Sequence, residues 1–394
     1  MQIKSKLGLS LLFVIVSSLI SFAQVNIDSI KELIVKLDSS RVIKDADKYM
    51  TEEPVTITSY KAKRSAGGIH DFYSEGDYWW PDPKNPEGPY IRKDGLTNPD
   101  NFVAHRKAMR RLSIEVPALV AAYKFTGNRK YAEYAVKHLL AWFVNKRTMM
   151  NPNLRYSQAI KGRFTGRGIG IIDAIHLVEV VQAAIVIEKD KLIKPEDLKK
   201  IKKWFGEFSG WLMNDQFGID ERNNGNNHST CWAMQVAEYA KFTGDTSKMN
   251  FCRNFFKKVL LPEQMASNGS FPKELARTKP YGYSLFNLDA MVMVARILSD
   301  SENNLWKFKT PEGADLETTL EFMYPFIKNK SSWPYPKDVM YFEDWPVRQP
   351  SLLFGGIAYD KEKYISLWKT LNPAPSKDEI LRNFFIRQPV LWIN

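Results

Sequence analysis

The sequence is poor in the residues that build disulfide frameworks and metal sites. Its 394 residues include two cysteines, Cys231 and Cys252, and five histidines, and no CxxC, HxxxH or HExxH spacing occurs. Metal sites in proteins use closely grouped ligands, so we expect no metal and no other cofactor. Both cysteines stand in helical patterns, where they either pair with each other or remain buried free thiols.

Long apolar runs are missing after the N-terminus. Residues 7–20 are apolar and follow Lys4 and Lys6, and Ser21-Phe22-Ala23 then provides a small-x-small cleavage pattern. This stretch is too short to span a bilayer and is typical of a secretory signal peptide. We therefore expect a signal peptide at residues 1–23, a single exported domain at residues 24–394 that is periplasmic or secreted, and no membrane span.

Acidic residues are outnumbered by basic ones. There are 44 Asp and Glu against 56 Lys and Arg, a net charge of +12, which falls by two to +10 without Lys4 and Lys6. The basic residues form no dense tract and no nucleic-acid-binding motif, which disfavours nucleic acid as a partner. The sequence also has 11 Trp, 17 Tyr and 23 Phe. Most of these rings are expected to pack in the core, and those that do not can stack on the faces of sugars. Basic groups beside rings favour an anionic polysaccharide as the partner. The oligomeric state is not indicated.

Alternating strand patterns are nearly absent, and helical spacing dominates from His105 onward. Two predicted helices share one ending, Lys124-Phe125-Thr126-Gly127 and Lys241-Phe242-Thr243-Gly244, with Gly as the C-cap. Recurring helix–Gly–helix units predict an all-α fold, an α/α toroid that forms an incomplete barrel of roughly six or seven helical hairpins with a cleft at one end. The expected helices include residues 27–37, 112–125, 131–143, 171–187, 195–212, 285–298, 316–327, 361–371 and 377–384.

A long N-terminal loop is expected between the first helix and the toroid. Residues 51–101 are dense in Gly, Pro, Asp and aromatic residues, and loops of this length usually have a function. The adjacent rings of Tyr78, Trp79 and Trp80 stand between polar turn residues, which is typical of a platform for stacking on sugars. Packing of these rings against the core is the alternative.

A polar run, Asn223-Asn224-Gly225-Asn226-Asn227-His228-Ser229, leads directly into a predicted helix. Asparagine caps helices and tolerates left-handed backbone, so the run predicts a tight loop that ends at a helix N-terminus. Such a terminus favours an anion, and the carboxamides of Asn226 and Asn227 and the imidazole of His228 would point at it. The alternative is a turn whose asparagines only satisfy backbone groups.

A second polar run, residues 273–284, also precedes a predicted helix. Arg277, Lys279, Tyr281 and Tyr283 form a cationic and phenolic cluster there. We expect a guanidinium to lower the pKa of a neighbouring phenol below its usual value of about 10, which would suit proton transfer. Packing of the tyrosines into the next helix is the alternative.

These parts fit an elimination across C4–C5 of a uronic acid. The C5 carboxylate must be neutralised so that the C5 proton can be removed. Asn227 and Arg277 could do this, with His228 as a further candidate. Tyr283 could remove the proton and protonate O4 if both lie on one face of the sugar ring. His228 could be the base where they lie on opposite faces, and a helix N-terminus would keep its ring neutral.

The same residues resemble a known family. The Asn-Asn-His-Ser run before a Trp-bearing helix, with Glu274-Leu275-x-Arg277 and a Tyr three residues before Phe286-x-Leu288, resembles the alginate lyase superfamily, polysaccharide lyase families 5 and 38. The segments 76–83 and 156–170 are more similar to family 38. The resemblance implies that Asn227 and Arg277 neutralise the carboxylate and that His228 and Tyr283 transfer protons.

Two spacings depart from the family 5 pattern. One residue is missing between Arg277 and Tyr283, and one is extra between Ser229 and Trp232. The first departure makes Tyr281 a competitor for the role of Tyr283, which we prefer because its spacing to the following helix is kept.

Further residues are expected to bind substrate. Gln158, Arg163 and Arg167 lie in a Gly-rich segment and could hold neighbouring uronate carboxylates, with surface solvation as the alternative for Arg163. The full set of expected substrate-binding residues is Tyr78, Trp79, Trp80, Gln158, Arg163, Arg167, Asn226, Lys279 and Tyr281.

The function expected is that of a polysaccharide lyase acting on alginate. Three alternatives remain: a glucuronan lyase with the same mechanism, a glycoside hydrolase, and a non-catalytic polyuronate-binding protein. A hydrolase would need two facing carboxylic acids, for which Asp71, Asp77 and Glu274 are candidates without an evident partner.

Overall fold

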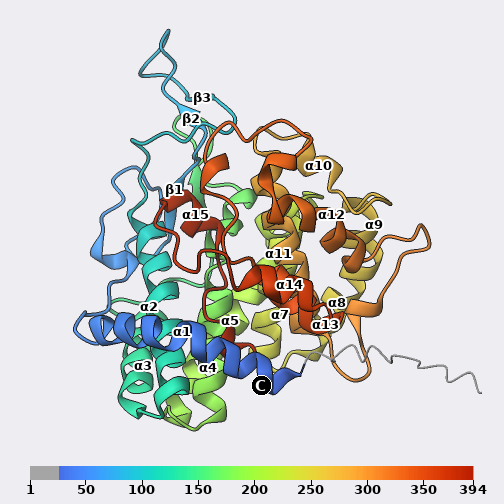
Figure 1. Cartoon of the computed structure of the whole chain (residues 1–394). Coiled ribbons are helices and arrows are strands. Elements are labelled where there is room, and N and C mark those ends of the chain that lie inside the picture. Colours follow the sequence, from blue (N-terminus) through green and yellow to red (C-terminus); the bar gives the residue numbers. More distant parts are fainter. Residues whose placement is uncertain (1–25, 394) are drawn as a thin grey trace, which may run out of the picture.

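The computed structural model describes residues 26–393, so the expected signal peptide lies outside the described residues. The fold is an α/α toroid (Figure 1). Its helices are α1 (Ile27–Tyr49), α2 (Ala104–Thr126), α3 (Arg129–Phe143), α4 (Leu177–Lys189), α5 (Pro195–Asn214), α6 (Gln216–Arg222), α7 (Asn227–Thr243), α8 (Thr246–Phe255), α9 (Leu261–Gln264), α10 (Pro272–Leu275), α11 (Pro280–Leu298), α12 (Leu316–Lys328), α13 (Pro350–Ala358), α14 (Glu362–Trp368) and α15 (Asp378–Asn383).

The helices form two layers. An inner series, α2, α4, α7, α11 and α13, packs side by side in that order. An outer series covers it: α1 and α3 lie on α2, α5 and α8 on α7, α12 on α11, and α14 on α13. Nearly every residue of α4, α7 and α11 is buried, as expected for helices that are covered on all sides. The predicted helical toroid is therefore confirmed.

The C-terminal segment closes the ring of helices. A short 3-10 turn, η7 (Pro389–Leu391), packs against α1, α2 and α4. The buried carboxylate of Glu179 on α4 accepts the backbone N–H groups of Arg387 and Gln388 at 2.7–2.9 Å. The chain end thus fills the seam between the first and last helices of the toroid.

Helix α1 is longer than expected, 27–49 rather than 27–37. Its buried positions recur at helical spacing, but the middle one is Asp38, which interrupts the apolar pattern. Asp38 is buried because Arg348 and Arg41 contact its carboxylate at 2.7 and 3.0 Å. Residues 171–187, expected as one helix, are divided between the 3-10 helix η2 (Gly168–Ala174) and α4.

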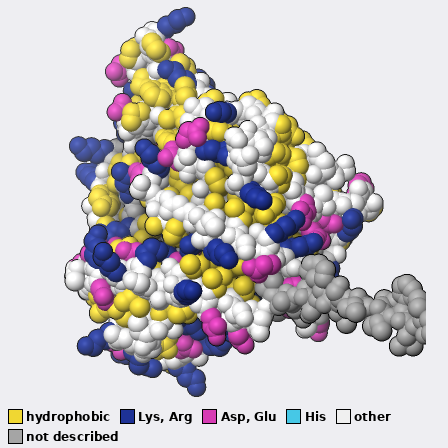
Figure 2. Space-filling model, viewed as in Figure 1, with side chains coloured by type: hydrophobic (Ala, Val, Ile, Leu, Met, Phe, Trp, Pro, Cys, Tyr) yellow, Lys and Arg dark blue, Asp and Glu magenta, His cyan; other side chains and the backbone are white. Residues whose placement is uncertain are grey.

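In the described part of the chain, four short strands lie at one end of the toroid. β1 (Tyr73–Glu75) pairs in parallel with β4 (Tyr156–Ala159), and β2 (Trp79–Trp80) pairs antiparallel with β3 (Ile91–Arg92). The segment around β2 and β3 projects from the body (Figure 1), and its tip displays apolar, basic and acidic side chains together (Figure 2). The expected long loop is therefore largely irregular but is tied down by these small sheets.

Cys231 and Cys252 are buried free thiols. Within residues 26–393 no single helix has both the length and the apolarity of a membrane span. Only η2 and α4, taken together as a bent pair, have that length and apolarity.

Candidate active site

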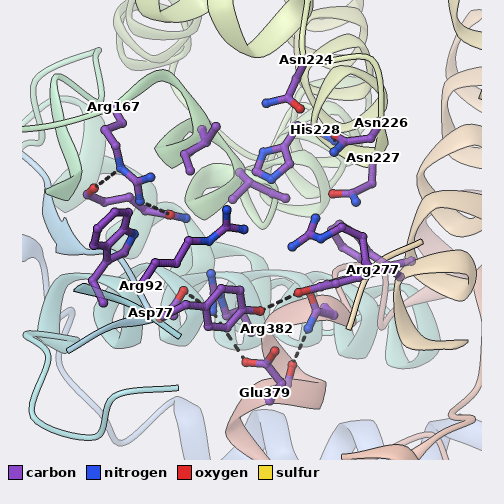
Figure 3. Close-up of a pocket in the computed structure, with 18 residues that line it drawn as sticks. Asp77, Arg92, Arg167, Asn224, Asn226, Asn227, His228, Arg277, Glu379 and Arg382 are labelled. Atoms are coloured by element: carbon purple, nitrogen blue, oxygen red, sulfur yellow. Dashed lines mark hydrogen bonds and ion pairs between the residues drawn. The ribbon is translucent and has the colours of Figure 1, made fainter. Parts of the chain in front are cut away.

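A cavity of about 420 Å³ opens at the end of the toroid that carries the strands (Figure 3). Its walls come from the β2–β3 segment, β4, η2, the N-termini of α7 and α11, and α15. Nine of the residues expected at the site line it: Tyr78, Trp79, Gln158, Arg167, Asn226, Asn227, His228, Arg277 and Tyr283.

The asparagine run forms the upper wall of the cavity in Figure 3. Asn226 is the N-cap of α7, and its side chain accepts the backbone N–H of His228 at 3.0 Å. Gly225 has a φ of 79°, a left-handed conformation that favours glycine and turns the chain into the helix. The predicted loop and helix start are therefore confirmed.

His228 is oriented by a buried acid. Its Nδ1 lies 2.8 Å from Oε1 of Glu221, whose side chain is fully buried on α6. When Glu221 is ionised it accepts the Nδ1–H, so that Nε2 carries the lone pair. Burial raises the pKa of Glu221, and His228 opposes that shift. Glu221 was not expected from the sequence.

Arg277 and two tyrosines form the opposite wall. The guanidinium of Arg277 lies over the ring of Tyr283, 4.7 Å from its centre, and contacts Asp94 at 3.5 Å. The hydroxyl of Tyr283 is 2.6 Å from the hydroxyl of Tyr78. His228, Arg277 and Tyr283 thus line one cavity, in which Figure 3 shows His228 and Arg277.

The expectation that Arg277 would lower the pKa of Tyr283 below 10 is wrong. Burial raises the pKa of Tyr283 to about 12, and Arg277 and the hydrogen bond shared with Tyr78 only reduce that shift. The phenol is therefore protonated at neutral pH and is ready to act as an acid.

Arg167 stands on the far side of the cavity from Asn227 (Figure 3). Its Nε donates to the carbonyl of Gln158 at 2.8 Å, and its guanidinium lies 5.8 Å from the ring centre of Trp79. Burial lowers its pKa to about 10, and among the described residues no carboxylate lies within ion-pair distance of it. A Cβ at Gly76 would come within 2.8 Å of this guanidinium and 2.7 Å of the Trp79 ring, so a larger residue there would displace these side chains. Arg167 is a half-buried cation available to an anion.

An ionic network forms the floor of the cavity, and the sequence did not reveal it. Arg382 contacts Asp77 at 2.7 Å, and buried Arg106 joins Asp77 to Asp173. Burial would raise the pKa of Asp77, but Arg106 and Arg382 together lower it to about 2. Arg382 and Glu379 come from α15, far along the chain from both polar runs. Asn224, Arg92 and Asn383 also line the cavity without having been assigned to it.

Four residues expected at the site do not line this cavity. Tyr281 is fully buried, and its hydroxyl donates to the carbonyl of Phe326 at 3.1 Å. The indole of Trp80 donates to the carbonyl of Leu96 at 2.9 Å. Both side chains therefore use their polar groups away from the cavity.

The other two are Arg163 and Lys279. Arg163 lies 5.5 Å from the ring centre of Trp79, and Lys279 lies 5.3 Å from the ring centre of Tyr78. Lys279 also contacts Glu379 at 3.1 Å. Both cations therefore contact rings that line the cavity without lining it themselves.

The carboxylates considered for hydrolysis are not a facing pair. Asp77 and Glu379 line the cavity, but each is bound to a basic residue. Glu274 lies behind Asn227, and Asp71 accepts a hydrogen bond from Asn151.

Comparisons with known proteins point to one family. A profile of the alginate lyase family matches residues 56–333. The chain is similar to an alginate lyase from Bacteroides ovatus, with 30% identity, a TM-score of 0.78, and coverage of 93% of this chain and 96% of that chain. Comparison with curated protein sequences gives no match.

More distant structures share the fold. Alginate lyase A1-III, in a His-to-Ala variant complexed with tetrasaccharide, is 14% identical with a TM-score of 0.57, covering 93% of this chain and 94% of that chain. The enzyme from Sphingomonas species A1 is 15% identical with a TM-score of 0.50, covering 79% and 84%.

The helical toroid, with this cationic and aromatic cavity at one end, defines a polysaccharide lyase. The profile spans more than two thirds of the sequence, and a relative with 30% identity covers nearly all of it. The chain therefore belongs to the alginate lyase family.

Proposed function

We propose that this lyase cleaves alginate by β-elimination across C4–C5 of a uronate, which leaves an unsaturated uronate at the new chain end. The observation that carries the proposal is that an imidazole, a guanidinium and a phenol, those of His228, Arg277 and Tyr283, line one cavity, with the guanidinium over the phenol ring. We also propose that the protein is exported after removal of residues 1–23 and that the remaining residues form a single catalytic domain. We further propose that it belongs to family 38 rather than family 5.

Neutralisation of the carboxylate is assigned to Arg277 and Asn227. Arg277 supplies a fixed positive charge beside the phenol, and the N-terminus of α7, where Asn227 stands, adds the positive end of the helix dipole. Charge that develops on the carboxylate as the C5 proton leaves is stabilised by these donors.

Proton transfer is assigned to His228 and Tyr283. A base removes the C5 proton, the electron pair forms the C4=C5 bond, and the C4–O4 bond breaks as an acid protonates O4. A phenol with a pKa of about 12 suits the acid. His228 Nε2, held by Glu221 through Nδ1, suits the base where the C5 proton and O4 lie on opposite faces, as in guluronate. Where they share a face, as in mannuronate, Tyr283 serves both steps: as the phenolate it takes the C5 proton, and it then gives that proton to O4. Arg277, which opposes the rise in the pKa of Tyr283, favours this phenolate.

Substrate binding beyond the cleaved bond is assigned to the platform of Trp79 with Arg167 and Gln158. The ring offers a stacking surface, and the unpaired guanidinium offers a partner for a neighbouring carboxylate.

The test incubates the purified chain with polymannuronate, polyguluronate and glucuronan, and follows the ultraviolet absorbance of unsaturated uronate ends together with product size. Alginate polymers are expected to give the absorbance, and the ratio of the two alginate rates separates the two proton routes. New reducing ends without absorbance would indicate hydrolysis. Absorbance from glucuronan alone would show that glucuronan, and not alginate, is the substrate.

A further inference from the structure

Glu274 and Asn227 are joined by two hydrogen bonds. Glu274 is buried on α10 and accepts the backbone N–H of Asn227 at 2.7 Å and its side-chain Nδ2 at 2.8 Å. With Nδ2 bound to Glu274, the amide oxygen of Asn227 faces the cavity (Figure 3). An acceptor there would repel the uronate carboxylate that the proposed function assigns to this place.

The proton of Glu274 decides which end of the amide faces the cavity. An ionised carboxylate only accepts, so it binds the NH₂ end of Asn227 and turns the oxygen outward. A neutral carboxylic acid still accepts the backbone N–H through one oxygen and donates its O–H through the other. The O–H then binds the amide oxygen of Asn227 and turns the NH₂ end into the cavity. The two amide orientations fill the same space.

The surroundings of Glu274 favour its neutral form. Burial raises its pKa, and the two bonds from Asn227 and the charges of Arg277 and His228 oppose that shift. The thiol of Cys231 on α7 also interacts electrostatically with Glu274, and Arg277 interacts with both Glu274 and Tyr283. A substrate carboxylate entering beside Asn227 adds a like charge, which favours protonation further.

We propose that Glu274 is a positioning residue that acts as a neutral carboxylic acid, and that its proton holds Asn227 with the NH₂ group donating to the substrate carboxylate. This inference rests on the proposed function of Asn227. Where Glu274 is ionised in the free enzyme, binding of one oligouronate takes up one proton from solvent, and product release returns it. The proton is not consumed by the elimination.

Glu274→Gln tests the proposal, because glutamine reproduces the neutral acid. Its carbonyl accepts the backbone N–H of Asn227, and its NH₂ group donates to the amide oxygen. We expect kcat/KM within about threefold of wild type at pH 6, and a smaller rise in KM than wild type between pH 6 and pH 9. A tenfold or greater loss of kcat/KM at pH 6 would overturn the proposal, because the charge of Glu274 would then be needed.

Proton uptake gives a second measurement. Calorimetric titration of an alginate tetrasaccharide, in two buffers of different ionisation enthalpy, is made in the Tyr283→Phe background so that the ligand is not cleaved. We expect uptake that grows with pH towards one proton, and that is lost when Glu274→Gln is added. Glu238→Gln, a buried carboxyl on α7 outside the cavity, is the matched control and leaves the uptake unchanged. Equal uptake with and without Glu274→Gln would refute the proposal. If wild type cleaves alginate but these results fail, only this inference falls; if wild type neither binds nor cleaves it, both fall.

Discussion

Removal of one hydroxyl from Tyr283 should separate chemistry from binding. Tyr283→Phe keeps the ring that lies 4.7 Å from the guanidinium of Arg277, so the carboxylate site is preserved. It removes the only atom of this side chain that can protonate O4. With a pKa of about 12, fewer than about one phenol in a thousand is ionised at pH 8, so the acid form is the one that is lost.

The expected magnitude follows from general acid–base catalysis, which contributes about 10²–10⁴-fold. We expect kcat to fall at least about a hundredfold and KM to stay within about threefold, measured by the absorbance of unsaturated ends. Loss of the hydrogen bond to Tyr78 should cost about 1 kcal/mol of unfolding free energy.

Tyr281→Phe is the matched control, because Tyr281 is two residues away and its hydroxyl binds the carbonyl of Phe326 in the core. It should lose a similar free energy of unfolding and keep its kcat. The reasoning is refuted if Tyr283→Phe retains more than a tenth of wild-type kcat, or if both variants lose activity equally.

Three other predictions follow from the cavity and the core. Arg277→Lys should lower kcat/KM by about 10–100-fold, because a lysine ammonium lacks the planar fork and its stacking on Tyr283. Arg167→Ala should raise KM about tenfold with little change in kcat, because it removes a binding contact distant from the proton transfers; an equal fall in kcat would contradict this role. Glu238→Gln tests stability in urea unfolding at pH 5 and pH 8. Burial raises the folded pKa of Glu238 to about 7, so the folded state binds more protons than the unfolded state and wild-type stability falls as pH rises from about 4.5 through 7. The glutamine variant should lack this loss of unfolding free energy, which is at most about 3 kcal/mol. An identical pH dependence of stability in both proteins would show that Glu238 does not titrate in this range.

Helix ends could be predicted from the sequence because they depend on a few neighbouring residues. The shared endings at Gly127 and Gly244 are both left-handed C-caps, with φ of 71° and 78°. The asparagine run ends at the N-cap Asn226, as its capping preference implies. In each case the signal lies within a few residues of the feature it predicts.

Side-chain direction could not be predicted where an element is covered on all sides. Helix α11 is buried around its whole circumference, so its apolar pattern does not indicate which tyrosine faces the cavity. The two-residue offset puts Tyr281 and Tyr283 on different faces of the helix. Trp79 and Trp80 are likewise adjacent in a strand, so only one of them can face the cavity.

Ion pairs between different structural elements could not be predicted from the sequence either. Arg382 on α15 meets Asp77 from the N-terminal loop, and Glu221 on α6 meets His228 on α7. The packing of the toroid brings these partners together, and their spacing along the chain follows no fixed pattern. Asp38 is another buried charge, and it interrupts the apolar pattern on which the predicted end of α1 rested. Its partner, Arg348, is distant in sequence.

The most direct test of the account is a crystal structure of the Tyr283→Phe variant with a bound alginate tetrasaccharide. The account predicts one uronate carboxylate within hydrogen-bond distance of Arg277 and of Asn227, with C5 of the same sugar between the His228 ring and the edge of Phe at position 283. A tetrasaccharide whose carboxylates contact only Arg167 and Arg92, with no sugar between His228 and position 283, would contradict it.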